Sequence, residues 1–164
     1  MKKLYYLIAI LGAGTAAQAQ LLFEANLDGL QEVPPNASPA FGSGDFTLSG
    51  TTLTLNGGAA YSDLLGGATA VTLNDAPPGM NGAIVLTLTL DTPGATAGTF
   101  SGSGSLTSGQ ITDLQAGNLY VNIRSQVFPS GEIRGQLSLV PEPSMMALAS
   151  LGLLGLLALS RRRS

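Results

Sequence analysis

The stretch LYVNIRSQVFPSGEIRGQL, residues 119–137, decides the fold of this chain. At both of its ends apolar and polar side chains alternate, which is the period-two pattern of a β-strand that buries one face. The residues between the two alternating segments, 126–130, are enough for a hairpin loop. The stretch therefore predicts two neighbouring antiparallel strands.

The apolar positions of these two strands predict how they pair. If Ile123 lies opposite Ile133, then Leu119 meets Leu137, and all four side chains share the core face. The hairpin would then bury one complete apolar face.

The other face of this hairpin is polar, and the same pairing places Arg124 opposite Glu132. One interpretation is an exposed cross-strand ion pair, worth about 0.2–1 kcal/mol. The alternative is a polar recognition patch, whose candidate residues are Tyr120, Asn122, Arg124, Glu132 and Arg134.

Period-two alternation continues through the interior of the chain, as in residues 51–55 and 84–90. Turn-forming Gly, Pro and Asn residues separate such runs, which is typical of many short strands. We therefore expect an all-β fold over residues 20–139, an antiparallel Greek-key-like β-sandwich with few if any helices. A signal peptide and a C-terminal hydrophobic helix are expected to flank it.

The first residues have the organisation of a secretory signal peptide. Lys2 and Lys3 precede a short apolar run, and Ala17-Gln18-Ala19 supplies the small residues that a signal peptidase accepts. We therefore expect residues 1–19 to be removed, with Gln20 as the first residue of the mature protein.

Residues 20–140 are strongly acidic. They contain two arginines, no lysine and nine carboxylates, which gives a net charge of −7. Such a domain cannot neutralise phosphates, so nucleic acid is not an expected partner.

The chain contains no histidine and no cysteine. This inventory excludes Ser-His-Asp and Cys-His nucleophiles, disulfides and the usual zinc and copper sites. We therefore expect no enzyme activity, no catalytic residue, no metal and no cofactor. A carboxylate-dependent glycan hydrolase that uses Glu32 and Glu132 is the enzymatic alternative, although no sequence feature places the two around one cleft.

The chain ends in a second apolar segment, residues 145–159. It lies between Val140-Pro141-Glu142-Pro143 and Arg161-Arg162-Arg163. As a helix it would be about 22 Å long, short against the ~30 Å hydrocarbon core of a bilayer, so its insertion would be marginal. The three arginines would stay cytoplasmic and leave residues 20–140 on the outer side. Marginal insertion fits a transient stop-transfer segment better than a permanent anchor or a core helix. The permanent anchor remains the alternative.

Four blocks of the central domain resemble the CHRD domain, named for chordin; in chain order they are residues 27–35, 81–85, 113–123 and 128–137. The resemblance implies an extracellular β-sandwich-like module that binds or has a structural role, and not an enzyme. The chain departs from the family pattern at residues 70–73 and 124–125, where the family usually carries histidines. A metal-dependent or pH-dependent role built on those histidines does not carry over.

The tail resembles the PEP-CTERM sorting signal of Gram-negative bacteria. The motif is Val140-Pro141-Glu142-Pro143, and the basic end is Arg161-Arg162-Arg163. The resemblance implies transient residence in the inner membrane, processing by an exosortase, and release to the cell surface or an exopolysaccharide matrix. Signal peptidase and exosortase are then the processing partners, and an extracellular polysaccharide or a surface protein is the expected ligand.

Overall fold

The structure is a computed structural model that describes residues 20–141. Gln20, Val140 and Pro141 are the predicted processing residues that it describes. The rest lie outside: the signal peptide with Ala17 and Ala19, Glu142 and Pro143 of the motif, the hydrophobic helix 145–159, and Arg161, Arg162 and Arg163. Within the described part of the chain, no helix combines the length and the apolar character needed to cross a membrane.

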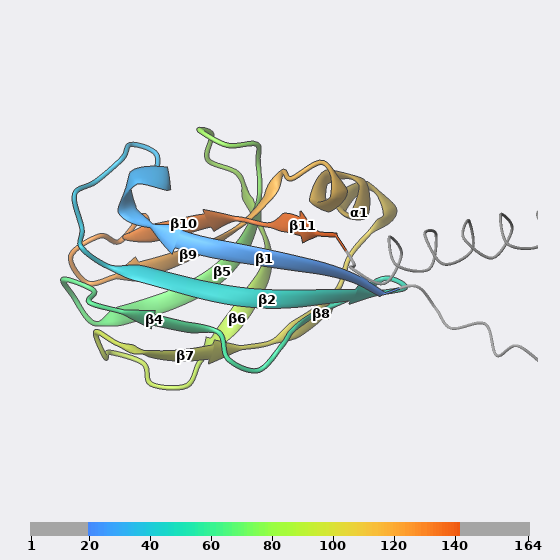
Figure 1. Ribbon diagram of the computed structural model, residues 1–164. Coiled ribbons are helices and arrows are strands. Elements are labelled where there is room, and N and C mark those ends of the chain that lie inside the picture. Colours follow the sequence, from blue (N-terminus) through green and yellow to red (C-terminus); the bar gives the residue numbers. More distant parts are fainter. Residues whose placement is uncertain (1–19, 142–164) are drawn as a thin grey trace, which may run out of the picture.

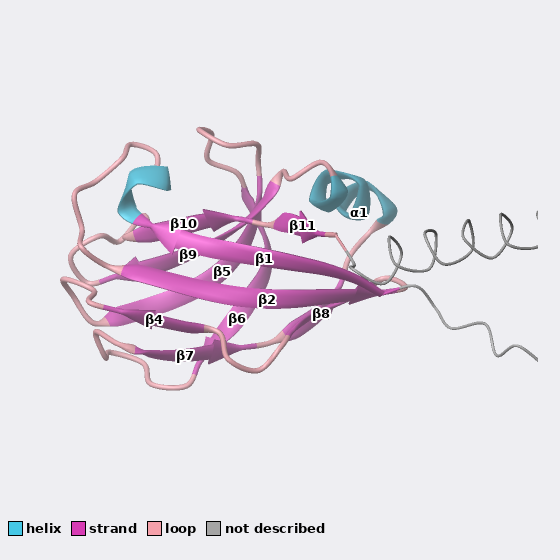
Figure 2. Cartoon of the chain, in the orientation of Figure 1, coloured by secondary structure: helices cyan, strands magenta, loops and turns pink. Residues whose placement is uncertain are grey.

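Eleven strands, one short 3-10 helix and one α-helix make up the domain (Figures 1 and 2). In chain order they are β1 (Gln20–Asp28), η1 (Gly29–Gln31), β2 (Phe41–Ser49), β3 (Thr52–Leu55), β4 (Ala60–Ser62), β5 (Ala68–Asp75), β6 (Ala83–Leu90), β7 (Gly98–Ser101), β8 (Ser103–Ser105), α1 (Ser108–Gln115), β9 (Leu119–Ser125), β10 (Ile133–Gln136) and β11 (Ser138–Val140).

The strands form one antiparallel sheet, which confirms the predicted all-β class. The sheet runs β11-β1-β10-β9-β5-β6-β7-β4-β2-β3-β8, and β1 also pairs with β2. This last pairing extends along the whole of β1, so the sheet closes on itself in a barrel-like arrangement. The two packed sheets expected of a sandwich are therefore parts of one continuous sheet.

The register predicted for the hairpin of β9 and β10 is confirmed. Ile133 pairs with Ile123, and the Leu137 amide donates to the Leu119 carbonyl oxygen over 2.8 Å. All four side chains are fully buried in the core, where alternate residues of β1, β2 and β5 meet them. Burying one such aliphatic side chain contributes about 1.5–3 kcal/mol, so the alternation in the sequence has a direct energetic reason.

The sequence predicted few if any helices and did not indicate where α1 lies. Its start carries a capping box, in which the Thr107 hydroxyl accepts from the Gln110 amide and the Gln110 side chain accepts from the Thr107 amide. Its single buried side chain, Leu114, anchors it to the barrel. The helix is only eight residues long, so its apolar periodicity is too short to stand out.

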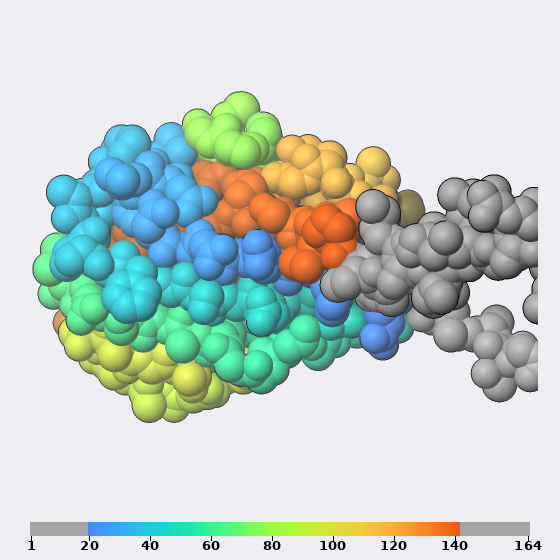
Figure 3. All heavy atoms as spheres, in the orientation of Figure 1, coloured from blue at the N-terminus to red at the C-terminus, as the bar shows by residue number. Residues whose placement is uncertain are grey.

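Two loops cover the outer face of β9 and β10. One is the segment from η1 to residue 40, and the other is residues 76–82, between β5 and β6. Figure 1 shows the first loop at the end of β1 and the second rising above the sheet. The space-filling view places both beside the orange surface of β10 (Figure 3). These two loops form the walls of the candidate site.

Candidate functional site

The polar residues predicted as a recognition patch do lie together on the outer face of the β9–β10 hairpin, but they are covered. Arg124 is half-buried, and the other four residues of the patch, Tyr120, Asn122, Glu132 and Arg134, are at most 4% exposed. The interpretation as an exposed Arg124–Glu132 ion pair is therefore wrong. The interpretation fails because the loops that cover this face come from residues far away in the sequence. Alternation within a strand cannot reveal such a cover.

Arg134 is the centre of this layer. Its guanidinium donates to the backbone oxygens of Met80 (2.7 Å) and Pro77 (3.2 Å) and to the Gln136 side-chain oxygen (3.2 Å). It stacks on the ring of Tyr120, 3.4 Å from the centroid, in a cation–π contact. Burial lowers the pKa of Arg134, and neighbouring Tyr120 and Glu32 oppose that shift. Arg134 thus holds the 76–82 loop onto the sheet.

Tyr120 and Gln136 hold the same loop from either side. The Tyr120 hydroxyl accepts from the Gly82 amide at 3.0 Å, and the Gln136 amide group donates to the carbonyl oxygens of Ala76 and Gly117. A side chain at Gly82 would collide with the backbone of Asp75, so only glycine permits this close return of the loop.

Glu132 holds the first loop onto the sheet, as Arg134 holds the second. One of its carboxylate oxygens accepts from the Ser38 hydroxyl and from the Leu65 amide, each over 2.6 Å. The Glu132 backbone oxygen accepts from the Asn36 side chain at 3.0 Å. Glu132 is fully buried; its Oε1 is therefore committed to the fold, whereas its Oε2 has no hydrogen-bond partner.

Glu32 also has a buried carboxylate oxygen without a hydrogen-bond partner. It follows η1, is 5% exposed, and its Oε1 has no hydrogen-bond partner. Burial raises the pKa of Glu32 from its usual 4.5 to about 7, against the opposing effects of Arg134, the Val33 backbone and Arg124. The sequence singled out Glu32 only as a partner of Glu132, and the structure gives the two carboxylates separate environments.

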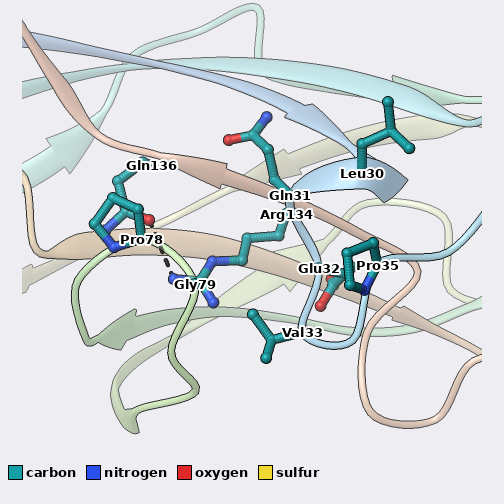
Figure 4. A pocket seen from close by; sticks show the side chains of 9 residues that line it. All are labelled: Leu30, Gln31, Glu32, Val33, Pro35, Pro78, Gly79, Arg134 and Gln136. Atoms are coloured by element: carbon teal, nitrogen blue, oxygen red, sulfur yellow. Dashed lines mark hydrogen bonds between the residues drawn. The ribbon is translucent and has the colours of Figure 1, made fainter.

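A pocket of about 340 Å³ opens between the two loops (Figure 4). Its polar lining comes from Gln31, Glu32, Arg134 and Gln136, and the remaining lining residues are Leu30, Val33, Pro35, Pro78 and Gly79. Figure 4 shows the Arg134 side chain extended between the side of Glu32 and Val33 and the side of Pro78 and Gln136.

The pocket brings together some of the predicted site residues and leaves others out. Of the predicted patch only Arg134 lines it, and Glu32 is the sole carboxylate among the described residues that do. The pair of carboxylates that a glycan hydrolase needs is therefore not assembled here. Among residues 20–141 no group of acidic side chains is arranged to hold a metal ion.

The two predicted processing sites lie at the ends of two paired strands. Gln20 is the first residue of β1 and Val140 the last of β11, and Leu22 pairs directly with Val140. Figure 1 shows these two strand ends together, at the end of the domain away from η1.

Comparison with known proteins finds two family matches. Residues 139–163 match the PEP-CTERM protein-sorting motif, so the chain carries the signal of an exported protein that an exosortase sorts to the cell envelope or surface. No curated protein and no solved structure matches the chain. Residues 23–137, from within β1 to the residue after β10, match the CHRD domain. The chain therefore belongs to the CHRD domain family.

Proposed function

We propose that this protein is a non-enzymatic binding component of the cell surface or of its exopolysaccharide matrix. In this proposal an exosortase removes the tail in the inner membrane and releases residues 20–140. The order of the two family matches supports it, because the sorting motif begins at residue 139, directly after the CHRD domain ends at residue 137.

The observation that carries the binding role is the pocket between the loops. Its volume of about 340 Å³ falls within the range typical of small-ligand sites, roughly 300–1,000 Å³. Arg134, at one side, has already donated to Met80, Pro77 and Gln136. The polar groups left for a ligand are therefore mostly acceptors, which favours a ligand rich in hydroxyl donors.

The charge of the domain points to the same class of ligand. With a net charge of −7 over residues 20–140, the domain repels anionic polymers at low salt. Leu30, Val33, Pro35 and Pro78 offer apolar contacts for the C–H faces of a sugar ring. We infer that the pocket takes an uncharged unit of an extracellular polysaccharide, in preference to a uronic acid.

Binding is tested with the exported protein and two polysaccharides, neutral dextran and anionic alginate. We expect retention on dextran and none on alginate. Leu30 lines the pocket and is 76% exposed, so Leu30→Ala removes ligand contact without disturbing the core, and about fivefold weaker binding is expected. Leu139→Ala is the matched control, since Leu139 is an exposed leucine on β11. Equal binding by wild type and Leu30→Ala, or binding to neither polymer, would contradict the proposal.

The fate of the tail is tested by intact-mass analysis of the protein isolated from the cell surface. We expect a chain that begins at Gln20 and ends within Val140–Pro143. Recovery of molecules that retain Arg161–Arg163 in the membrane fraction would instead establish the permanently anchored alternative.

A further inference from the structure

Two buried hydrogen-bond acceptors lie close to Gly131, behind the wall of the pocket. Glu32 Oε1 and Asn122 Oδ1 are both buried and both without a partner. They lie 2.5 and 2.6 Å from one and the same point, the position that a Cβ atom on Gly131 would occupy. Two acceptors form a hydrogen bond with each other only when one of them carries a hydrogen. The Asn122 amide group already donates to the Ser130 carbonyl oxygen at 3.1 Å, so its orientation is fixed.

The charged and titratable groups around Glu32 do not supply that hydrogen. Arg124 and Tyr120 on β9 and Arg134 on β10 share this layer, and none of them donates to Glu32 Oε1. Glu132 accepts from Ser38 and Leu65 through Oε1, while its Oε2 and the Arg124 Nε are also buried without a partner. The loop 76–82 has no ionisable side chain. On its own segment, Asp28 accepts from the Gln31 amide at the start of η1. Both arginines favour the ionised carboxylate, but burial outweighs them and raises the pKa of Glu32 to about 7.

We propose that Glu32 is a proton-operated latch: when protonated, its carboxyl donates to Asn122 Oδ1 and fastens the loop 29–40 to β9. Loss of this proton leaves an unpaired carboxylate against the Asn122 oxygen, and the loop loosens. The step is a simple acid dissociation, with the proton released to solvent.

The latch regulates the pocket because Glu32 lies in the middle of its wall. Gln31, Glu32 and Val33 all line the pocket, and the Val33 carbonyl oxygen accepts from Asn81 of the opposite loop at 2.8 Å. Fastening this segment pre-organises the pocket, so less ordering is needed when a ligand binds. This regulatory role rests on the proposed function, and it predicts tighter polysaccharide binding at pH 6 than at pH 8.

The latch is tested first without any ligand. In the exported protein, the carboxyl carbon of Glu32 is followed by NMR from pH 4 to pH 9 and assigned by its loss in Glu32→Gln. We expect a midpoint near pH 7, which moves at least one pH unit toward acid in Asn122→Ala because the protonated form loses its acceptor. A midpoint near 4.5, or one that Asn122→Ala leaves unchanged, overturns the latch.

Hydrogen exchange gives a second readout that needs no variant. The amides of Glu32 and Asn36 both donate to the Gly29 carbonyl oxygen and report on the closed loop. After correction for intrinsic exchange, their opening should rise up to roughly tenfold per pH unit between pH 5 and 7 and then level off. Glu24→Gln, at an exposed carboxylate on β1, should keep this profile, and Glu32→Gln should flatten it.

Dextran binding at pH 6 and pH 8 separates the two proposals. A midpoint near 7 without dextran binding at either pH would refute the proposed function and leave the latch intact. Binding with an ordinary Glu32 midpoint would refute the latch alone. A midpoint near 7 with equal binding at both pH values would refute the control of the pocket by the latch.

Discussion

The free energy of unfolding should depend on pH through Glu32. Burial raises its pKa from 4.5 to about 7 in the folded protein, so the folded state binds this proton more tightly than the unfolded chain. The stabilisation is complete below pH 4.5 and is lost as the pH rises through 7. A shift of this size is worth about 3 kcal/mol, most of which is lost between pH 5 and pH 8.

Glu32→Gln isolates this contribution. The glutamine amide can donate to Asn122 Oδ1 as the protonated carboxyl does, but it does not titrate. The stability of the variant relative to wild type should therefore rise by about 2–3 kcal/mol between pH 5 and pH 8. Urea unfolding followed by circular dichroism measures this as a gain of roughly 1–2 M in midpoint, from m-values of about 1–3 kcal/mol/M.

The matched control is Glu24→Gln, which removes an exposed carboxylate on β1. Its stability difference from wild type should stay within about 0.5 kcal/mol at every pH. If the difference between Glu32→Gln and wild type is the same at pH 5 and pH 8, Glu32 does not carry the perturbed pKa and the argument from its unpaired oxygen fails.

Three further predictions concern the contacts of the loops with the sheet and of β10 with β1. Arg134→Lys cannot reproduce the planar set of donors to Met80, Pro77 and Gln136, and should cost about 2–3 kcal/mol in urea unfolding; a loss below 0.5 kcal/mol would show that the loop does not depend on it. Ser38→Ala removes a donor to the buried Glu132 carboxylate and should cost about 1.5–3 kcal/mol, whereas Ser38→Thr, which keeps the hydroxyl, should recover most of it. Gly135→Ala would place a Cβ 2.5 Å from the Asn26 carbonyl oxygen, where β10 meets β1, and should lower the thermal midpoint by several degrees; an unchanged midpoint would mean that the two strands can separate at no cost.

The sequence predicted those parts of the fold that depend on neighbouring residues. The pairing of Ile123 with Ile133 follows from alternation within one hairpin, because a slip by one residue would turn a whole apolar face to solvent. The closure of the sheet depends instead on β1, which pairs with strands from both halves of the chain. Pairings over such separations leave no local pattern.

The candidate site was predictable only in part for the same reason. Tyr120, Asn122 and Arg134 share a face because they alternate along paired strands, and this much could be expected from their spacing. Their burial could not be, because the loops that cover them are held by specific contacts such as that of Arg134 with Met80. The role of Glu32 depends on an unpaired oxygen, which only the folded arrangement reveals.

The pairing of Leu22 with Val140 holds the start of β1 and the end of β11 at the same end of the domain. β1 starts beside this pair and runs for nine residues to η1, the beginning of the pocket wall, a distance of about 30 Å at ~3.3 Å per residue. Both chain ends of the described domain therefore lie at the end away from the pocket. Under the proposed processing, cutting the tail at Val140–Pro143 would leave the contacts of the two loops untouched.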